Sequence, residues 1–189
     1  DLVTGVQTCA LPICSTATEK EWPVERMARV VRWLVEERGA EIVFCGAPRD
    51  MAMHREIADG AGIGGHAHDL TPALGLRETG GLLSRMDLCL GIDTGLLHLA
   101  ASHGVPVVAL FGPTDPNQWC PWGTRVEVLR STHTEKTLAT RLHEAVFPGS
   151  VAGLRWPTGA ARIDAIGTDE VMAAVDRLLG APSALRRAG

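Results

Sequence analysis

The sequence has no excess of basic residues and no long apolar run, and each absence excludes a class of function. Its 189 residues carry 18 Lys and Arg against 22 Asp and Glu, a formal net charge of -4, so it lacks the basic footprint of a nucleic-acid-binding protein. Its longest apolar runs, such as Val105 to Phe111, fall far short of the roughly 20 residues that span a bilayer. We therefore expect no nucleic-acid partner and no transmembrane segment.

Spacings typical of metal ligands are also missing. No CxxC pair occurs, and no combination of Cys and His has the spacing of a zinc site. Two of the thiols fall inside expected strands, where a reduced cysteine packs as a small apolar side chain. We therefore expect no metal, no cofactor and a reducing, cytoplasmic environment for the five cysteines, which are Cys9, Cys14, Cys45, Cys89 and Cys120.

The composition is that of a folded protein, with 46% apolar and 21% charged residues. Apolar periodicity and turn residues predict short buried strands alternating with helices. This alternation is typical of βαβ units, so we expect an α/β fold with a Rossmann-like, doubly wound parallel sheet. The expected helices cover 23–38, 51–59, 76–85, 95–103 and 168–179, and the expected strands cover 41–45, 68–71, 88–92, 106–111 and 126–129.

The first fourteen residues do not follow this pattern. They show neither helical nor alternating periodicity, and Pro12 interrupts their one apolar run. Residues 3–13, VTGVQTCALPI, resemble the translation of a common sequencing-library adapter. We therefore expect residues 1–14 to be artefactual, or else a natural but irregular N-terminus, with the natural protein extending further upstream. Residues 15–180 are expected to form one Rossmann-like domain, 131–162 show no clear period, and 181–189 read as a frayed tail.

The junction between the strand at 88–92 and the following helix carries Asp93, Thr94 and Gly95. Ligands of open parallel sheets bind beyond the carboxyl ends of the strands, and a helix N-terminus there offers free N–H groups to an anion, best of all to a phosphate. Gly95 would allow close approach, Thr94 would offer a hydroxyl, and Asp93 would accept hydrogen bonds from sugar hydroxyls. The spacing is equally compatible with Asp93 or Thr94 being a simple N-cap.

His98 lies four residues after Thr94, on the same helix face one turn later. A lone histidine at such a position packs more often than it catalyses. On spacing alone, the residue is a candidate for packing first and for chemistry second.

The run from Gly91 to Pro116, GIDTGLLHLAASHGVPVVALFGPTDP, resembles the signature of glycosyltransferase family 9, the ADP-heptose:lipopolysaccharide heptosyltransferases. Residues 20–23 resemble the family's K-x-W-P entry to a helix. Residues 43–50, VFCGAPRD, resemble its strand and glycine-rich loop, and residues 168–179 its closing helix. The resemblance covers most of residues 18–180.

Membership of that family implies the GT-B architecture, in which two Rossmann-like domains face each other across a cleft. The chain looks like the C-terminal, donor-binding domain alone. The resemblance implies substrate-binding roles at the diphosphate for Lys20, Thr94, Gly95 and Leu96, at the ribose for Asp50, at sugar hydroxyls for Asp93, and a supporting role beside the phosphate loop for His98.

The implied reaction is inverting transfer of heptose from ADP-heptose to a lipopolysaccharide inner-core acceptor. The family's general base and its acceptor site lie in the N-terminal domain, so this chain is expected to bind donor without catalysing transfer. The whole enzyme would be cytoplasmic, at the inner face of the bacterial inner membrane. Two alternatives stay open: a GT-B enzyme that uses another nucleotide sugar, and a non-catalytic nucleotide-binding module.

Overall fold

The computed structural model describes residues 7–13, 20–71, 73–130, 134–135 and 160–180. Their central feature is a six-stranded parallel sheet with the strand order β3-β2-β1-β4-β5-β6. The strands are β1 (Thr8–Leu11), β2 (Glu41–Phe44), β3 (Ala67–Asp69), β4 (Leu88–Ile92), β5 (Val107–Phe111) and β6 (Val126–Arg130). The order reverses direction at β1, which makes the sheet doubly wound and confirms the expected fold class.

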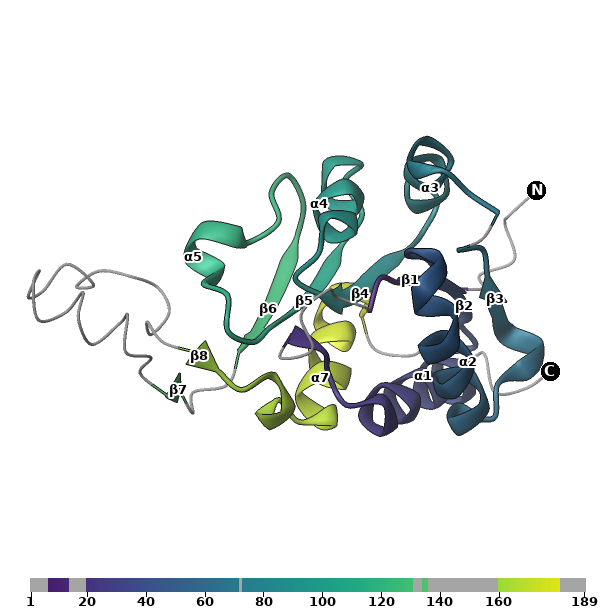
Figure 1. Cartoon of the computed structure of the whole chain (residues 1–189), viewed down its shortest axis with the longest axis horizontal. Coiled ribbons are helices and arrows are strands. Elements are labelled where there is room, and N and C mark those ends of the chain that lie inside the picture. The colour runs from purple at the N-terminus through teal and green to yellow at the C-terminus, as the bar shows by residue number, and fades with distance from the viewer. Residues whose placement is uncertain (1–6, 14–19, 72, 131–133, 136–159, 181–189) are drawn as a thin grey trace, which may run out of the picture.

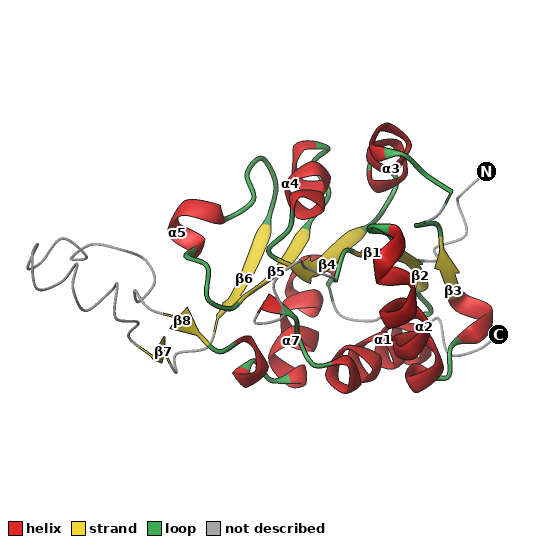
Figure 2. Ribbon diagram, in the orientation of Figure 1, coloured by secondary structure: helices red, strands yellow, loops and turns green. Residues whose placement is uncertain are grey.

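Helices cover both faces of the sheet, as Figures 1 and 2 show. One layer contains α1 (Val24–Arg38), α2 (Met51–Ala61) and α7 (Thr168–Leu179), and the opposite layer contains α3 (Leu76–Leu83) and α4 (Gly95–Ser102). The buried side chains accordingly form two clusters, one beneath α1, α2 and α7 and one beneath α3 and α4. Since both faces are covered, β4 and β5 are buried at every position and have the continuous apolar sequences typical of parallel strands.

The α1 helix shows how sequence dictates one of these elements. Met27, Val30, Val31 and Leu34 repeat at helical spacing and are all buried. The helix ends at Gly39, whose φ of 61° lies in the left-handed region that a glycine adopts without a Cβ clash. The expected boundaries at 23–38 were therefore correct to one residue.

The expectation that residues 1–14 lie outside the fold is wrong for the described part of this segment. Residues Thr8–Leu11 form β1, which pairs with β2 on one side and with β4 on the other. Cys9, Ala10 and Leu11 are fully buried or nearly so. A strand buried on both faces has no alternation to detect, and Pro12 follows the last strand residue, where its missing N–H removes no bond of β1. The adapter resemblance concerns the origin of these residues, and it stays a hypothesis.

Further differences lie in the C-terminal half. A short helix, α5 (Pro116–Trp119), forms where no helix was expected, and Trp119 and Trp122 are exposed. A small antiparallel sheet pairs β7 (Thr134–Glu135) with β8 (Ala160–Ala161). The 3₁₀ turns are η2 (Pro48–Asp50), η3 (Gly64–His66) and η4 (Ile163–Ala165). Most of residues 131–162 and the tail 181–189 lie outside the described residues.

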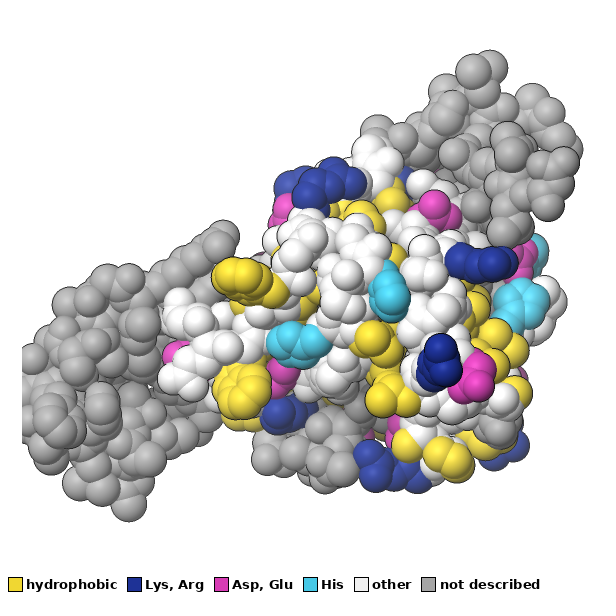
Figure 3. Space-filling view, turned by 90° about the horizontal axis from the view of Figure 1, so that it is seen from above, with side chains coloured by type: hydrophobic (Ala, Val, Ile, Leu, Met, Phe, Trp, Pro, Cys, Tyr) yellow, Lys and Arg dark blue, Asp and Glu magenta, His cyan; other side chains and the backbone are white. Residues whose placement is uncertain are grey.

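The surface above α3 and α4 mixes both signs of charge with histidine and apolar side chains (Figure 3). No helix of the described ranges is long and apolar enough to cross a membrane.

Candidate functional site

A cleft of about 240 Å³ opens where β1, β2 and β4 end. These three strands flank the point at which the strand order reverses, which is where ligands bind in doubly wound sheets. The lining combines the segment after β1, the loop after β2 and the start of α4. It consists of Pro12, Ile13, Cys45, Gly46, Ala47, Arg49, Asp50, Thr94 and Leu96.

The N-terminus of α4 forms one wall of this cleft. Thr94 is its N-cap residue, with extended backbone angles, but its side chain makes no capping hydrogen bond. The Thr94 hydroxyl is buried without a hydrogen-bond partner. A buried hydroxyl that lacks a hydrogen-bond partner destabilises the fold. If Thr94 served only to cap α4, its hydroxyl would accept a hydrogen bond from a backbone N–H of the first turn. Its position therefore favours a ligand oxygen as the partner.

Gly95 leaves open space at the same point. A Cβ built on Gly95 would meet no atom within 4 Å, so its lack of a side chain serves no packing contact with the described residues. The first N–H groups of α4 carry the positive end of the helix dipole. An anion placed over Gly95 would meet those groups directly.

The side chain of Lys20 places a positive charge beside the start of α4. The Lys20 ammonium lies 3.1 Å from a carboxylate oxygen of Asp93, and the side chains are 26% and 11% exposed. The pair brings together the K-x-W-P segment and the D-T-G segment, 73 residues apart in sequence. Trp22 anchors the first of these segments, since it is buried and its indole N–H donates to the Ile166 carbonyl at 3.2 Å. Because Trp22 holds this segment in place, the positive charge of Lys20 is positioned near the start of α4.

Asp50 lines the cleft but is engaged with its own loop. Its Oδ2 accepts a hydrogen bond from the Ala47 N–H at 2.7 Å, and Arg49 approaches its Oδ1 at 3.4 Å. A Cβ on Gly46 would lie 2.5 Å from the same carboxylate, so Gly46 gives Asp50 the room to turn inward. Asp50 is 7% exposed. Its expected contact with a ribose stays a prediction, with Oδ1 as the oxygen directed away from the Ala47 contact.

Leu96 lines the cleft and packs against the cluster beneath α4. His98 is half-buried on the next turn of α4 and is not among the residues that line the cleft. Of the predicted site residues, the fold therefore brings Asp50, Thr94 and Leu96 into one cleft with Lys20, Asp93 and Gly95 at its margin. The supporting role of His98 stays a prediction.

Sequence reasoning gave no individual site role to the other lining residues, among them Pro12, Ile13 and Cys45. Pro12 and Ile13 were excluded with the N-terminal segment, although the reversal of strand order makes the end of β1 a natural ligand contact. Cys45 also lines the cleft, but burial raises the pKa of its thiol to about 12, so it is an inert apolar wall rather than a nucleophile.

The G-P-T-D-P segment, residues 112–116, follows β5 and leads into α5. Asp115 caps α5, because its Oδ1 accepts a hydrogen bond from the Asn117 N–H at 2.9 Å. None of its residues lines the cleft. Across the part of the chain that the structure describes, no group of three or more His, Cys, Asp or Glu side chains could hold a metal ion.

Fold and cleft define the chain as a Rossmann-like α/β domain with an anion-compatible site at its switch point. Comparison with known proteins identifies the family. The sequence model of glycosyltransferase family 9 (heptosyltransferase) matches residues 6–145. Lipopolysaccharide heptosyltransferase 3 of Escherichia coli K12 is 30% identical over 196 residues, covering 97% of this chain and 51% of that protein. The chain therefore belongs to glycosyltransferase family 9.

Solved structures show the same fold. A glycosyltransferase family 9 protein from Veillonella parvula is 25% identical, with a TM-score of 0.74 over 92% of this chain and 46% of that one. The E. coli heptosyltransferase WaaC, solved with ADP, is 19% identical, with a TM-score of 0.67 over 93% of this chain and 45% of that one. The described fold is thus one half of a GT-B structure. The chain spans about half the length, or less, of the curated relatives it matches.

Proposed function

We propose that this chain is the donor-binding domain of a heptosyltransferase that moves heptose from ADP-heptose to a lipopolysaccharide inner-core acceptor. The observation that carries the proposal is the start of α4, where an unpartnered buried hydroxyl on Thr94 and open space over Gly95 border the cleft at the switch point. Family membership supports the heptose. The ADP in the WaaC structure supports an adenine nucleotide.

In this proposal the donor diphosphate lies over Gly95. The N–H groups of Gly95 and Leu96 and the Thr94 hydroxyl donate to phosphate oxygens, and Lys20 adds a positive charge. Asp93 accepts hydrogen bonds from sugar hydroxyls, while its ion pair holds Lys20 in place. Asp50 receives a ribose hydroxyl through Oδ1. These contacts stabilise the diphosphate as it leaves, when its charge increases.

Transfer also needs a base that takes the proton of the attacking acceptor hydroxyl, as the bond from the anomeric carbon to the diphosphate breaks. We assign that base and the acceptor site to the N-terminal domain of the full-length enzyme, at the cytoplasmic face of the inner membrane. The chain of 189 residues then binds donor and does not catalyse transfer. Incubation with ADP-heptose and a heptose-free core acceptor is expected to give no product.

Calorimetric titration of the whole chain with ADP, ADP-heptose and UDP tests the donor assignment. We expect both adenine compounds to bind more tightly than UDP. Thr94→Val is nearly isosteric and removes a hydroxyl without a protein partner, so stability should hold. ADP affinity should fall about tenfold, the contribution of one hydrogen bond to a charged oxygen.

Thr124→Val is the matched control, because Thr124 donates its hydroxyl to the Gly104 carbonyl at 2.9 Å, before β6 and away from the cleft. It should leave ADP affinity unchanged. A folded chain that binds no adenine nucleotide, or a Thr94→Val variant with full affinity, would contradict the proposed donor site.

A further inference from the structure

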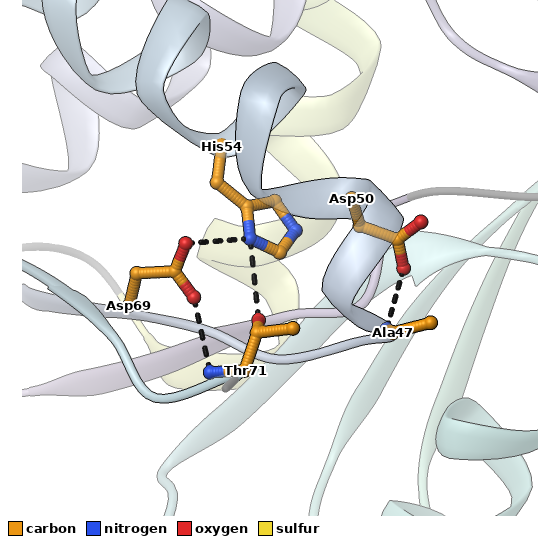
Figure 4. Close-up of polar contacts among 5 residues, drawn as sticks. All are labelled: Ala47, Asp50, His54, Asp69 and Thr71. Carbon is orange, nitrogen blue, oxygen red and sulfur yellow. Dashed lines mark hydrogen bonds and ion pairs between the residues drawn. The ribbon is translucent and has the colours of Figure 1, made fainter. Parts of the chain in front are cut away.

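A buried histidine joins α2 to the loop after β3, next to the cleft. His54 lies in the first turn of α2 and is 1% exposed. Its ring stacks on Phe44 of β2 with centroids 4.9 Å apart and an angle of 19° between the planes. Its Nδ1 lies 3.1 Å from Asp69 Oδ2 and 3.3 Å from Thr71 Oγ1 (Figure 4).

Asp69 completes this cluster. It ends β3, and its Oδ1 accepts the Thr71 N–H at 3.0 Å. Burial alone raises the pKa of Asp69, but the hydrogen bonds from Thr71 and His54 outweigh it and hold that pKa below its ordinary value. An ionised carboxylate only accepts hydrogen bonds, so His54 must carry its proton on Nδ1 and donate it to Asp69.

The same helical stretch forms a wall of the cleft. Asp50 precedes His54 by one turn, and Figure 4 shows both residues on the start of α2, with Asp50 turned to Ala47. Arg49 and Asp50 line the same cleft as Thr94. The segment 47–54 is thus fixed at its beginning by Asp50 and at its end by His54.

In the proposed function Asp50 meets the ribose, so a diphosphate over α4 puts the nucleoside against Arg49 and Asp50, which line the same cleft as Thr94 and Leu96. A shift of the wall would then disturb the ribose and base, and leave the diphosphate contacts as they are.

We infer that His54 is a positioning residue of the donor site: through Asp69 and Thr71 it locks the start of α2 to the loop after β3 and so sets the affinity for the nucleoside end of the donor. The inference rests on the proposed function. Packing alone would be served by a phenylalanine stacked on Phe44. The paired hydrogen bonds instead fix the orientation of the start of α2, which continues from the cleft wall at Arg49 and Asp50, relative to the loop after β3.

Two substitutions separate the roles of the ring and the donor. His54→Phe keeps a ring on Phe44 and removes the donor to Asp69, whereas His54→Asn keeps a donor near the Nδ1 position and removes the ring. Ile57→Val is the control for a general loss of packing, since Ile57 is buried on the same helix. Each variant of the whole chain is titrated with ADP and with inorganic pyrophosphate.

We expect His54→Phe to bind ADP about tenfold more weakly, the scale of one lost hydrogen bond, with pyrophosphate binding unchanged. His54→Asn should recover most of the ADP affinity, and Ile57→Val should change neither ligand. Equal weakening of both ligands in His54→Phe, or none, would overturn the inference alone. A wild-type chain that binds neither ligand would overturn the proposed function, and this inference with it.

Hydrogen exchange without any ligand gives a second, independent readout. The Thr71 amide, which donates to Asp69, should exchange at least about tenfold faster in His54→Phe than in Ile57→Val, because the carboxylate that holds it loses its own anchor. Equal exchange rates in the two variants would show that His54 does not fix this loop, and the inference would fail.

Discussion

At the scale of the residue, Gly91 shows how closely the site's strands approach each other. A Cβ at this position of β4 would lie 2.3 Å from the Pro12 carbonyl oxygen, in the segment that leads from β1 into the cleft. Gly91→Ala should therefore force β1 and β4 apart and destabilise the fold by about 1–3 kcal/mol, the usual cost of overpacking. Urea unfolding followed by circular dichroism measures this difference.

Gly81→Ala provides the comparison, since a Cβ at Gly81 meets nothing within 4 Å and the residue is exposed in α3. This variant should be stabilised, by up to about 1 kcal/mol, through its better helix propensity. If Gly91→Ala were as stable as wild type, the close contact between β4 and Pro12 would be wrong.

Individual residues also show which parts of the site could be predicted from the sequence. Asp93, Thr94 and Gly95 directly follow a wholly apolar strand, so their place at a carboxyl edge could be predicted from order alone. His54 and Asp69 could not be paired in this way, because their contact depends on how β3 lies against β2. Long-range register of that kind leaves no local pattern.

At the scale of the element, the edge strand β3 is held to β2 by a cluster of side chains as well as by its backbone. Glu41 Oε1 lies 2.8 Å from His66 Nδ1, and its Oε2 lies 2.6 Å from His68 Nε2. The hydrogen bonds from His66 and then His68 hold the pKa of Glu41 below its ordinary value of 4.5. The folded state therefore favours the ionised form.

The sign of the pH dependence follows from that shift. A carboxylate with a depressed folded pKa contributes stability above its unfolded pKa and loses it as the pH falls through the folded value. Glu41→Gln should lower the free energy of unfolding by up to about 1 kcal/mol at pH 6, as for an exposed ion pair. The difference from wild type should shrink as the pH falls below 4.5 and vanish below the folded pKa of Glu41, in urea titrations at several pH values.

Glu36→Gln, an exposed change on α1, controls for the lost charge and should match wild type throughout. A Glu41→Gln variant whose deficit persists unchanged at acid pH would show that its ionised form is not what the cluster stabilises. Helix boundaries needed no such contacts: Gly39 marks the end of α1 in the sequence as in the structure, and the second helix, expected to end at residue 59, extends two residues further to Ala61.

At the scale of the whole molecule, the fold expected from the sequence differs from the structure mainly in one short segment, the central strand β1. The alternation of helices and strands after residue 20 was enough to predict a doubly wound sheet. It did not reveal the central strand, because four residues buried on both faces resemble any short apolar run. Without β1, the strand order would lose the point at which it reverses, and the cleft would lose Pro12 and Ile13.

Deletion of residues 1–14 should therefore prevent folding. It removes the partner of both β2 and β4 and the buried side chains of Leu11 and Ile13, worth roughly 1.5–3 kcal/mol each. Domains are stable by only about 5–15 kcal/mol, so the loss of two strand pairings in addition exceeds what the fold can bear. Deletion of residues 1–6 keeps all of β1 and should leave the urea midpoint unchanged. A cooperative, wild-type-like unfolding transition in residues 15–189 would show instead that β1 is dispensable for the fold.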